Sequence, residues 1–444
     1  MASNHSLNTF EKNKWLFIVA GLVMALAVLG MIFIGPGSTR NKAKAPVVKE
    51  GEEIPKTEII MWGLWDESSV IDTLSAAYQS IDPTISIKYQ KVSITDYEKE
   101  LIQALAEDRG PDIFAIHHTW PYQASIMNLA QPMPDSVMSL DEYKSSFVKV
   151  VPNDFIKGEK VWGFPLFLDT LALFYNKDLY YIENIQDPPT TWEEVQQLSK
   201  RFAKIDLNGN IVQVGISMGA GANIARSPDI ISLLMLQGGI DLSGTIKYRE
   251  GSEVTKNYLS SAENVLKFYT DFANPKSTLY TWNLAQNYSL DMFAQKRSAM
   301  MIGYAYHMEQ LATLSPRLNY GVSKIPQISD DPSILPVNYA NYWGYTVAKR
   351  SQNADKSYRF LKFLTSREAS QKYFELTKRV SPRIDLIDTI KQDPTYGVFA
   401  DQILTAQSWK QPNNYEEDKR IVESIDSILR GEQNISAGVD TFVK

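Results

Sequence analysis

Strand-like and helix-like segments alternate from Glu58 onward, and this alternation limits the fold more than any other feature. The segment "EIIMWGLW" (58–65) is typical of a strand, "ESSVIDTLSAAYQSI" (67–81) has helical spacing, and "TISIKYQKV" (84–92) alternates as a strand again. A second helix, "TDYEKELIQALAED" (95–108), and a third strand, "DIFAIHH" (112–118), follow. This order predicts an α/β fold built on a mostly parallel sheet with helices on both faces.

Other local sequence signals predict where individual helices, strands and turns lie. In the 67–81 helix, Val70, Leu74, Ala77 and Ile81 lie on one stripe, which we expect to face inward. Thr191 and Glu194 form a T-x-x-E capping box that predicts the start of a helix. The segment "DLNGN" (206–210) begins like a calcium loop, but Ser217 stands where a bidentate glutamate is needed, so we interpret it as a turn between helix and strand. Helices are also expected at 261–273, 354–366 and 415–431, and a strand at 342–349.

The N-terminal part contains twenty consecutive residues without a charge, Trp15 to Ile34. As a helix this run would be roughly 30 Å long, which matches a bilayer core. We predict an uncleaved transmembrane anchor at 15–34, preceded by a tail (1–14) and followed by a flexible linker (35–57) with three prolines and three glycines. The lysines and arginines on either side of this run, counted alone, favour an orientation in which the chain after the anchor lies on the cytoplasmic side.

Composition excludes several classes of site. The chain has no cysteine, which rules out disulfides, thiolate metal sites, cysteine nucleophiles and a lipid-modified cysteine. It has four histidines, and the adjacent His117 and His118 would point to opposite faces of a strand, so no metal site and no cofactor are expected. The net charge of −6 gives no reason to expect nucleic acid as a partner.

Motifs of catalysis are also missing. The sequence holds no G-x-S-x-G, P-loop or H-E-x-x-H motif, and the glycine-rich "GAGAN" (219–223) lacks the lysine of a phosphate-binding loop. A glycosidase needs two facing carboxylates, and only Asp66 and Asp169 are marked out at strand ends. We therefore expect a protein that is not an enzyme, although glycan hydrolysis stays open as an alternative.

Asp169 interrupts an apolar run, "FPLFLDTLALFYNKDLY" (164–180). An unpaired buried carboxylate is costly, so Asp169 is either paired in a core or exposed in a cleft. Aromatic residues also fall in or beside loops and strand ends, where a pyranose could stack on the ring faces while a carboxylate accepts its hydroxyl groups. These aromatic residues are Trp62, Trp65, Trp120, Tyr306, Trp343 and Trp409.

From about Thr57 to its end, the chain resembles the family 1 extracellular solute-binding proteins of ABC importers, the maltodextrin- and sugar-binding type. The resemblance is carried by "GPDIFAIHHTW" (110–120), "WGFPLFLDTLALFYNKDLY" (162–180), "PPTTWEEV" (188–195), "FAQKRSAMMIGYAYHM" (293–308), "NYGVSKIP" (319–326) and "WGYTVAKRSQNADKSYRFLKFLTS" (343–366). It implies a two-lobe periplasmic-binding-protein-like (type II) fold with a hinge and an interlobe cleft. Lobe 1 would comprise 58–168 and 337–380, and lobe 2 would comprise 169–336 and 381–444, with crossings near 166–171 and 325–342.

The resemblance also implies a function: a membrane-anchored binding protein that captures a sugar or oligosaccharide by hinge closure and delivers it to the permease subunits of an ABC importer. Asp169 matches an acidic residue that bonds a sugar hydroxyl in this family, Asp66 another ligand-contacting acid, and Tyr306 a stacking aromatic. Thr119 and Trp120 replace an acid and an arginine of the maltodextrin binders, and Trp65 and Trp409 are additional rings.

The expected ligand-binding residues are therefore Asp169, Asp66, Trp65, Trp120, Tyr306, Trp343 and Trp409. The family works outside the cytoplasmic membrane, which we weigh above the count of flanking charges. A non-sugar solute remains an alternative. A polyamine would need several acids, and a phosphorylated molecule could use Arg379 and Arg383.

Overall fold

The computed structural model describes residues 56–240, 259, 261–409 and 413–441, which belong to one compact unit. Within these ranges no helix combines the length and the hydropathy that crossing a bilayer requires. The predicted tail, the predicted anchor at 15–34 and nearly all of the predicted linker lie outside the described residues.

The first lobe is built on a five-stranded sheet in the order β2-β1-β3-β14-β4. Its strands are β1 (Thr57–Gly63), β2 (Ile85–Lys91), β3 (Ile113–His117), β4 (Ala130–Gln131) and β14 (Trp343–Ala348). The parallel arrangement is confirmed for β1 with β2 and β3, whereas β14 runs antiparallel to both β3 and β4. The sheet is therefore mixed. Its antiparallel strand β14 comes from a segment more than 200 residues after β3.

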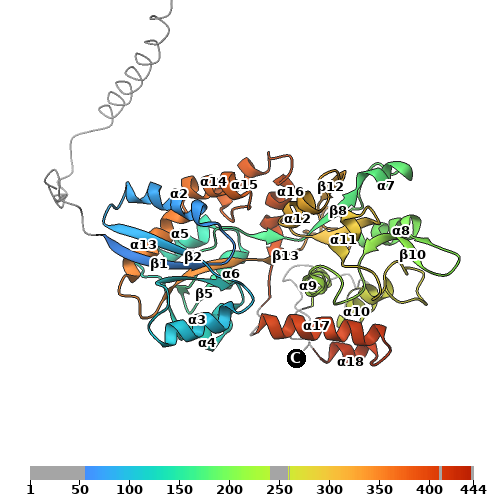
Figure 1. The fold of residues 1–444 in the computed structure, drawn as a ribbon, viewed down its shortest axis with the longest axis horizontal. Helices are drawn as coiled ribbons and strands as arrows, with labels where there is room; N and C mark the ends of the chain where they lie inside the picture. Colours follow the sequence, from blue (N-terminus) through green and yellow to red (C-terminus); the bar gives the residue numbers. More distant parts are fainter. Residues whose placement is uncertain (1–55, 241–258, 260, 410–412, 442–444) are drawn as a thin grey trace, which may run out of the picture. The chain divides into compact units, whose positions relative to one another are not determined.

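Helices cover both faces of this sheet (Figure 1). Three that contact one another lie on one face: α2 (Ser68–Gln79), α13 (Ala354–Leu364) and α14 (Arg367–Thr377). The opposite face carries α3 (Tyr97–Ala106). The smaller elements of this part are α4 (Ala124–Met127), α5 (Leu140–Ser146), α6 (Val150–Phe155), β5 (Ile156–Lys157), β6 (Lys160–Val161), α15 (Ile384–Ile390), α16 (Gly397–Gln402) and the 3-10 turns η1 (Trp120–Tyr122) and η2 (Ile403–Thr405).

The predicted inward stripe of the first helix is wrong by one residue. The buried side chains of α2 are Ile71, Leu74, Ser75 and Tyr78, which also follow helical spacing, whereas Ile81 is 66% exposed beyond the helix end. Tyr78 packs against Phe360 and Phe363 of α13, with ring centroids 5.3 and 5.0 Å away. These aromatic partners decide which of two adjacent stripes is buried.

The second lobe has a sheet in the order β12-β8-β11-β10-β9. Its strands are β8 (Ala172–Asn176), β9 (Lys204–Ile205), β10 (Ile211–Ser217), β11 (Ser298–Gly303) and β12 (Tyr320–Ser323). Only β10 and β11 are parallel; the other pairs are antiparallel. Its helices are α7 (Lys177–Ile182), α8 (Trp192–Phe202), α9 (Ser227–Gln237), α10 (Ala262–Asp271), α11 (Ser289–Ala294), α12 (His307–Leu314), α17 (Asn414–Leu429) and α18 (Ile435–Val439).

Two local predictions in this lobe are tested directly. The capping box of α8 is confirmed, since the Thr191 hydroxyl accepts from the Glu194 N–H while the Glu194 carboxylate accepts from the Thr191 N–H. Residues 206–210 form a turn, as predicted, in which Asp206 accepts from the backbone N–H groups of Asn208 and Asn210. The turn joins β9 to β10 in a hairpin rather than a helix to a strand, because the short strand β9 follows α8.

A three-stranded sheet lies between the two lobes, at the middle of Figure 1, in the order β15-β13-β7. Its strands are β7 (Asp169–Thr170), β13 (Asn338–Asn341) and β15 (Ala406–Gln407). Two of these strands lie in or beside the predicted crossings, and β15 adds a third connection. The predicted boundaries of the lobes stay a prediction. Leu386 of α15 and Phe399 of α16, which that prediction assigns to lobe 2, lie in the core that contains β1 and β3.

Candidate functional site

A cavity of about 460 Å³ lies against this central sheet and is lined by both lobes. Such a volume falls within the usual range of small-molecule sites, roughly 300–1,000 Å³. The segments that line it include the loop after β1 (Trp65), the crossing at 167–169, the residue before α9 (Arg226), the turn after β11 (304–306), the central strand β13 (Asn341), the first residue of β14 (Trp343), the end of α14 with the residues after it (377–380) and the start of α17 (414, 415, 418). We call this cavity the cleft.

Asp169 stands in the wall of the cleft, at the first crossing between the lobes. Strand β7 pairs it with Asn341 of β13, and its carboxylate accepts one bond from the Ala305 N–H at 3.3 Å. Burial raises the pKa of this carboxyl to about 7. Among the described residues no lysine or arginine forms an ion pair with it. The carboxylate therefore keeps acceptor capacity that a ligand can use.

Aromatic side chains form the first-lobe wall. Trp65 and Trp343 meet edge to face, with ring centroids 6.2 Å apart. The Nε1 of Trp65 has no hydrogen-bond partner among the described residues. Trp120 lies behind Trp343, at 5.2 Å, and supports it without lining the cleft. On the second lobe, Tyr306 is 40% exposed and stacks on Tyr304, with ring centroids 5.8 Å apart.

Arg379 is held in place from behind by Asp66. The Asp66 carboxylate, 2% exposed, accepts from Arg379 Nη1 at 3.0 Å and from the Tyr373 hydroxyl at 2.7 Å. Burial raises the pKa of Asp66, and the nearby Arg379 opposes that shift. Arg379 Nη2 donates to the Trp65 carbonyl at 3.1 Å, and the guanidinium lies 4.9 Å from the Phe167 ring centroid. Asp66 thus orients a cation of the cleft wall and does not line the cleft itself.

A second charged cluster lines the opposite wall. Arg226 adopts a left-handed backbone conformation (φ 56°) and donates two bonds of 2.8 Å to Asp229. The Tyr304 hydroxyl and the Asn341 amide also donate to Asp229, at 2.6 and 3.2 Å. Asp418 of α17 lies 3.7 Å from Arg226, and its pKa is raised to about 7 by burial and by Asp229. Backbone strain of this kind is concentrated at ligand-binding positions.

The rings of His117 and His118 do not point to opposite faces of a strand, as the sequence predicted. Their ring centroids are 4.2 Å apart rather than on opposite faces, because β3 ends at His117 and the chain turns there. His117 lines the cleft, bonded to Thr119 and to Asn341 at 2.8 and 3.1 Å. Across the described part of the chain, no group of three or more histidine, aspartate or glutamate residues is arranged to hold a metal ion.

The structure brings four of the seven expected residues together. Asp169, Trp65, Tyr306 and Trp343 line the cleft. The other three do not line it. Asp66 lies behind Arg379. Trp120 is fully buried and donates to Asn414 at 3.2 Å, and Trp409 is 5% exposed in the core of the second lobe.

Arg226, Asn341 and Asp418 line the cleft without having been singled out by the sequence analysis. The only nearby signal was "GAGAN" (219–223), and two of its backbone N–H groups already have a partner. Gly221 and Ala222 donate to the Asp426 carboxylate of α17 at 2.7 and 3.1 Å. The loop therefore binds an anion supplied by the chain itself, and thereby joins α17 to the segment that carries Arg226.

Comparisons with known proteins agree with this geometry. The family model described as "Bacterial extracellular solute-binding protein" matches residues 65–371. The galactooligosaccharide-binding protein of Bacillus subtilis is 21% identical over 331 residues, which cover 73% of this chain and 72% of that protein.

Two solved structures share the fold. A cyclo/maltodextrin-binding protein in complex with maltotetraose aligns with a TM-score of 0.68 at 18% identity, covering 89% of this chain and 97% of that chain. An ABC substrate-binding protein from Listeria monocytogenes in complex with cycloalternan aligns with a TM-score of 0.66 at 14% identity, covering 87% and 97%. The two-lobe α/β architecture is thus shared across chains of very different sequence.

Proposed function

The chain belongs to the bacterial extracellular solute-binding proteins, and from that premise we propose that it captures a sugar or oligosaccharide in the cleft between its lobes. The observation that carries the proposal is Asp169, a half-buried carboxylate with one backbone bond and no cationic partner among the described residues. It lines the same cleft as the rings of Trp65, Trp343 and Tyr306. Ring faces suit the C–H faces of a pyranose, and the carboxylate suits its hydroxyl groups.

The remaining cleft groups support the same ligand class. Arg379 and Arg226 are each compensated by a buried aspartate of the protein, so neither cation requires an anionic ligand. Both guanidinium groups line the cleft and carry five N–H groups each, more than the bonds that they make to their aspartates, so they can also donate to the oxygens of a sugar. The relative from Bacillus subtilis is named for binding galactooligosaccharides, which gives the proposal independent support.

Binding would proceed by closure of the lobes about the central sheet. Groups from both walls line the cleft, so a ligand that contacts both walls binds the closed form more tightly than the open form. Ligand binding then shifts the population toward the closed form. This mechanism requires no covalent step.

We further propose that the protein works outside the cytoplasmic membrane and delivers its ligand to the permease subunits of an ABC importer. The extracellular assignment rests on the family. The charge-free run at 15–34 would serve as the anchor, in place of the lipid-modified cysteine that this cysteine-free chain lacks.

The test is a saccharide titration followed by tryptophan fluorescence, with the full chain in a detergent that has no sugar headgroup. We expect saturable binding of at least one mono- or oligosaccharide, with the sugar recovered unaltered by mass spectrometry. Asp169→Asn should weaken binding at least tenfold, about 1.4 kcal/mol. Tyr306→Ala should weaken it by a similar factor, since it removes a stacking face.

Matched controls separate a binding effect from a folding effect. Asp72→Asn on α2 and Tyr181→Ala on α7 change exposed residues of the same types away from the cleft and should leave affinity unchanged. If no saccharide binds, the sugar assignment fails. If a shortened product is recovered, the protein is a glycan-processing enzyme instead.

A further inference from the structure

The charged side chains of the cleft carry more negative than positive charge. Two arginines are each paired with a buried aspartate behind the wall, and one lysine and one glutamate stand exposed at the rim. These residues are Arg379 with Asp66, Arg226 with Asp229, and the exposed Lys378 and Glu309. Asp169 and Asp418 are added to them. Three positive and five negative side chains therefore leave a net charge of −2 when all are ionised.

Asp418 of α17 lines the cleft and has no hydrogen-bond partner among the described residues. The cation beside it is Arg226, whose Nη2 lies 3.7 Å away and whose guanidinium already donates two bonds of 2.8 Å to Asp229. The Asp418 side chain is 27% exposed, whereas the Asp229 side chain is 2% exposed. A ligand in the cleft can therefore reach Asp418, and this carboxylate keeps acceptor capacity for it.

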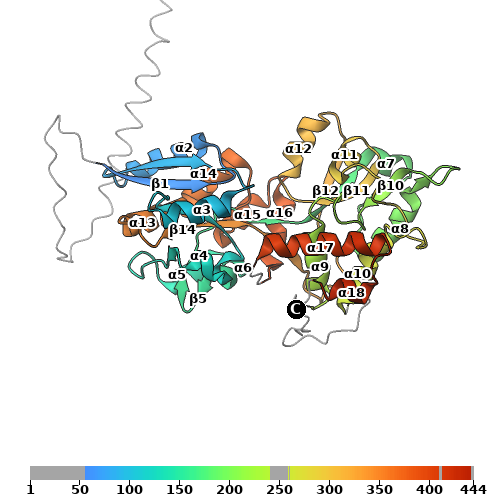
Figure 2. The same ribbon diagram turned by 60° about the horizontal axis from the view of Figure 1, so that its bottom comes forward.

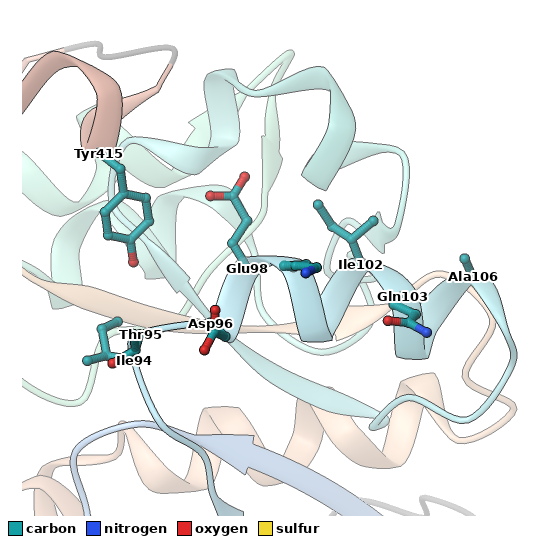
Figure 3. Close-up of a pocket in the computed structure, with 9 residues that line it drawn as sticks. Ile94, Thr95, Asp96, Glu98, Ile102, Gln103, Ala106 and Tyr415 are labelled. Carbon is teal, nitrogen blue, oxygen red and sulfur yellow. The ribbon is translucent and has the colours of Figure 1, made fainter. Parts of the chain in front are cut away.

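An aromatic ring stands beside this carboxylate. Tyr415 precedes Asp418 by three residues on α17, so the two side chains share a face of the helix, and both line the cleft. Figure 3 shows Glu98 of α3 beside the same ring. Burial, together with the charges of Glu98 and Asp418, raises the pKa of Tyr415 to about 12. A ring face next to surplus negative charge is a favourable position for a ligand cation.

A neutral ligand would not compensate the surplus charge. A sugar hydroxyl can donate to Asp418, but it also displaces water from a carboxylate whose neighbouring arginine is already paired. An ammonium group donates charge-assisted bonds, which are roughly twice as strong as neutral ones, and supplies the missing positive charge. The aromatic walls and Asp169 still favour a pyranose. A sugar in which an amine replaces a hydroxyl group meets both requirements.

We propose that the cleft selects a sugar that carries a protonated amine, and that Asp418 is the residue that determines this selection. The inference rests on the proposed function and specifies the chemical class of its ligand. Asp169 accepts a hydroxyl group of the sugar, while Asp418 accepts the ammonium group next to the Tyr415 ring. The two carboxylates thus have different tasks, which can be measured separately.

The experiment compares sugars that differ in one substituent. Glucose, galactose, mannose and the cello-oligosaccharides up to the tetramer are titrated under the same conditions as above, beside their amino and N-acetylamino counterparts. The N-acetyl form keeps the nitrogen and removes the charge. Each ligand is titrated at neutral pH into the full chain, into Asp418→Asn and into Asp187→Asn, which removes the same charge from an exposed position outside the cleft.

We expect the wild type and the Asp187→Asn control to bind the amine form of the preferred sugar at least about tenfold more tightly than its hydroxyl and N-acetyl forms. In Asp418→Asn the ratio of these affinities should fall to about one. Asp169→Asn should instead weaken the binding of all three forms. An amine preference that Asp418→Asn leaves unchanged would overturn the role of Asp418.

The comparison of ligands on the wild type decides the proposal even where a variant is unstable, which circular dichroism melting curves would reveal. If a hydroxyl or N-acetyl form binds the wild type as tightly as the amine, the selection is overturned and the proposed function stands. If no saccharide binds, charged or neutral, the proposed function fails as well. A polyamine such as putrescine that binds more tightly than every amino sugar would overturn the sugar in both proposals.

Discussion

Asp169, which lines the cleft, affects the stability of the folded protein through its proton. Its carboxyl has a pKa of about 7 in the fold, raised by burial from an ordinary value of 3.8. Between these values the folded protein holds a proton that the unfolded chain has released. The free energy of unfolding therefore falls as the pH rises through this window. An unpaired carboxylate in the wall of the cleft therefore costs stability at neutral pH.

Asp169→Asn should remove this loss in the unliganded protein. We expect the free energy of unfolding of the variant, relative to wild type, to be higher at pH 8 than at pH 4.5 by on the order of 1 kcal/mol or more. Urea unfolding followed by circular dichroism at both pH values measures the difference. Asp72→Asn on the surface of α2 is the control and should show the same difference at both. A variant that behaves like the control would contradict the assigned environment of Asp169.

At the scale of elements, local signals place several of the longer helices correctly. The helices expected at 261–273, 354–366 and 415–431 are found at 262–271, 354–364 and 414–429. The strand expected at 342–349 is found at 343–348. Capping and periodicity are properties of neighbouring residues, so they can be recognised before any tertiary contact is known.

Helix α8 offers a direct test of such a signal. Thr191→Ala removes the hydroxyl that accepts from the Glu194 N–H at 3.2 Å, and we expect a loss of about 1 kcal/mol in the free energy of unfolding. Urea unfolding at fixed pH measures it. Thr313→Ala removes a threonine from an exposed position on α12, where the hydroxyl bonds only to a helical carbonyl, and should cost less than half as much. Equal losses in the two variants would mean that the capping box is not what stabilises α8.

At the scale of the whole described unit, three strands connect two lobes, and the cleft lies against them. Figure 2, turned from the view of Figure 1, again shows the first-lobe and second-lobe helices in separate groups. Because the connections are few and the cleft walls belong to different lobes, ligand-dependent rotation of one lobe against the other is the motion we expect.

The absence of native cysteine makes this motion measurable with introduced pairs. Thr73→Cys on α2 with Tyr181→Cys on α7 places one spin label on each lobe at exposed positions. A saturating saccharide should shorten the distance between them in pulsed electron paramagnetic resonance. The pair Thr73→Cys with Asp141→Cys lies within the first lobe and should not change. An unchanged distance between lobes, despite binding, would exclude closure.

The sequence by itself determined the α/β class and the positions of several helices, and it marked Asp169 as an unusual residue. Each of these depends on periodicity, capping or one unusual residue within a short window. The sequence could not separate Trp343, which lines the cleft, from Trp120, which supports it from behind, because both stand at or beside the ends of strands. Trp120 is buried against Tyr97 and Trp343, and its N–H donates to Asn414, 294 residues away.

Only the tertiary structure decided which charged residues line the cleft. Arg226 has no distinctive sequence context, and it reaches the cleft because α9 begins there and Asp229 holds the guanidinium. Asp66 stands beside Trp65 in the chain, yet Tyr373 and Arg379, more than 300 positions later, turn it into a support. Lobe packing brings such residues together, and no local pattern encodes contacts at that separation.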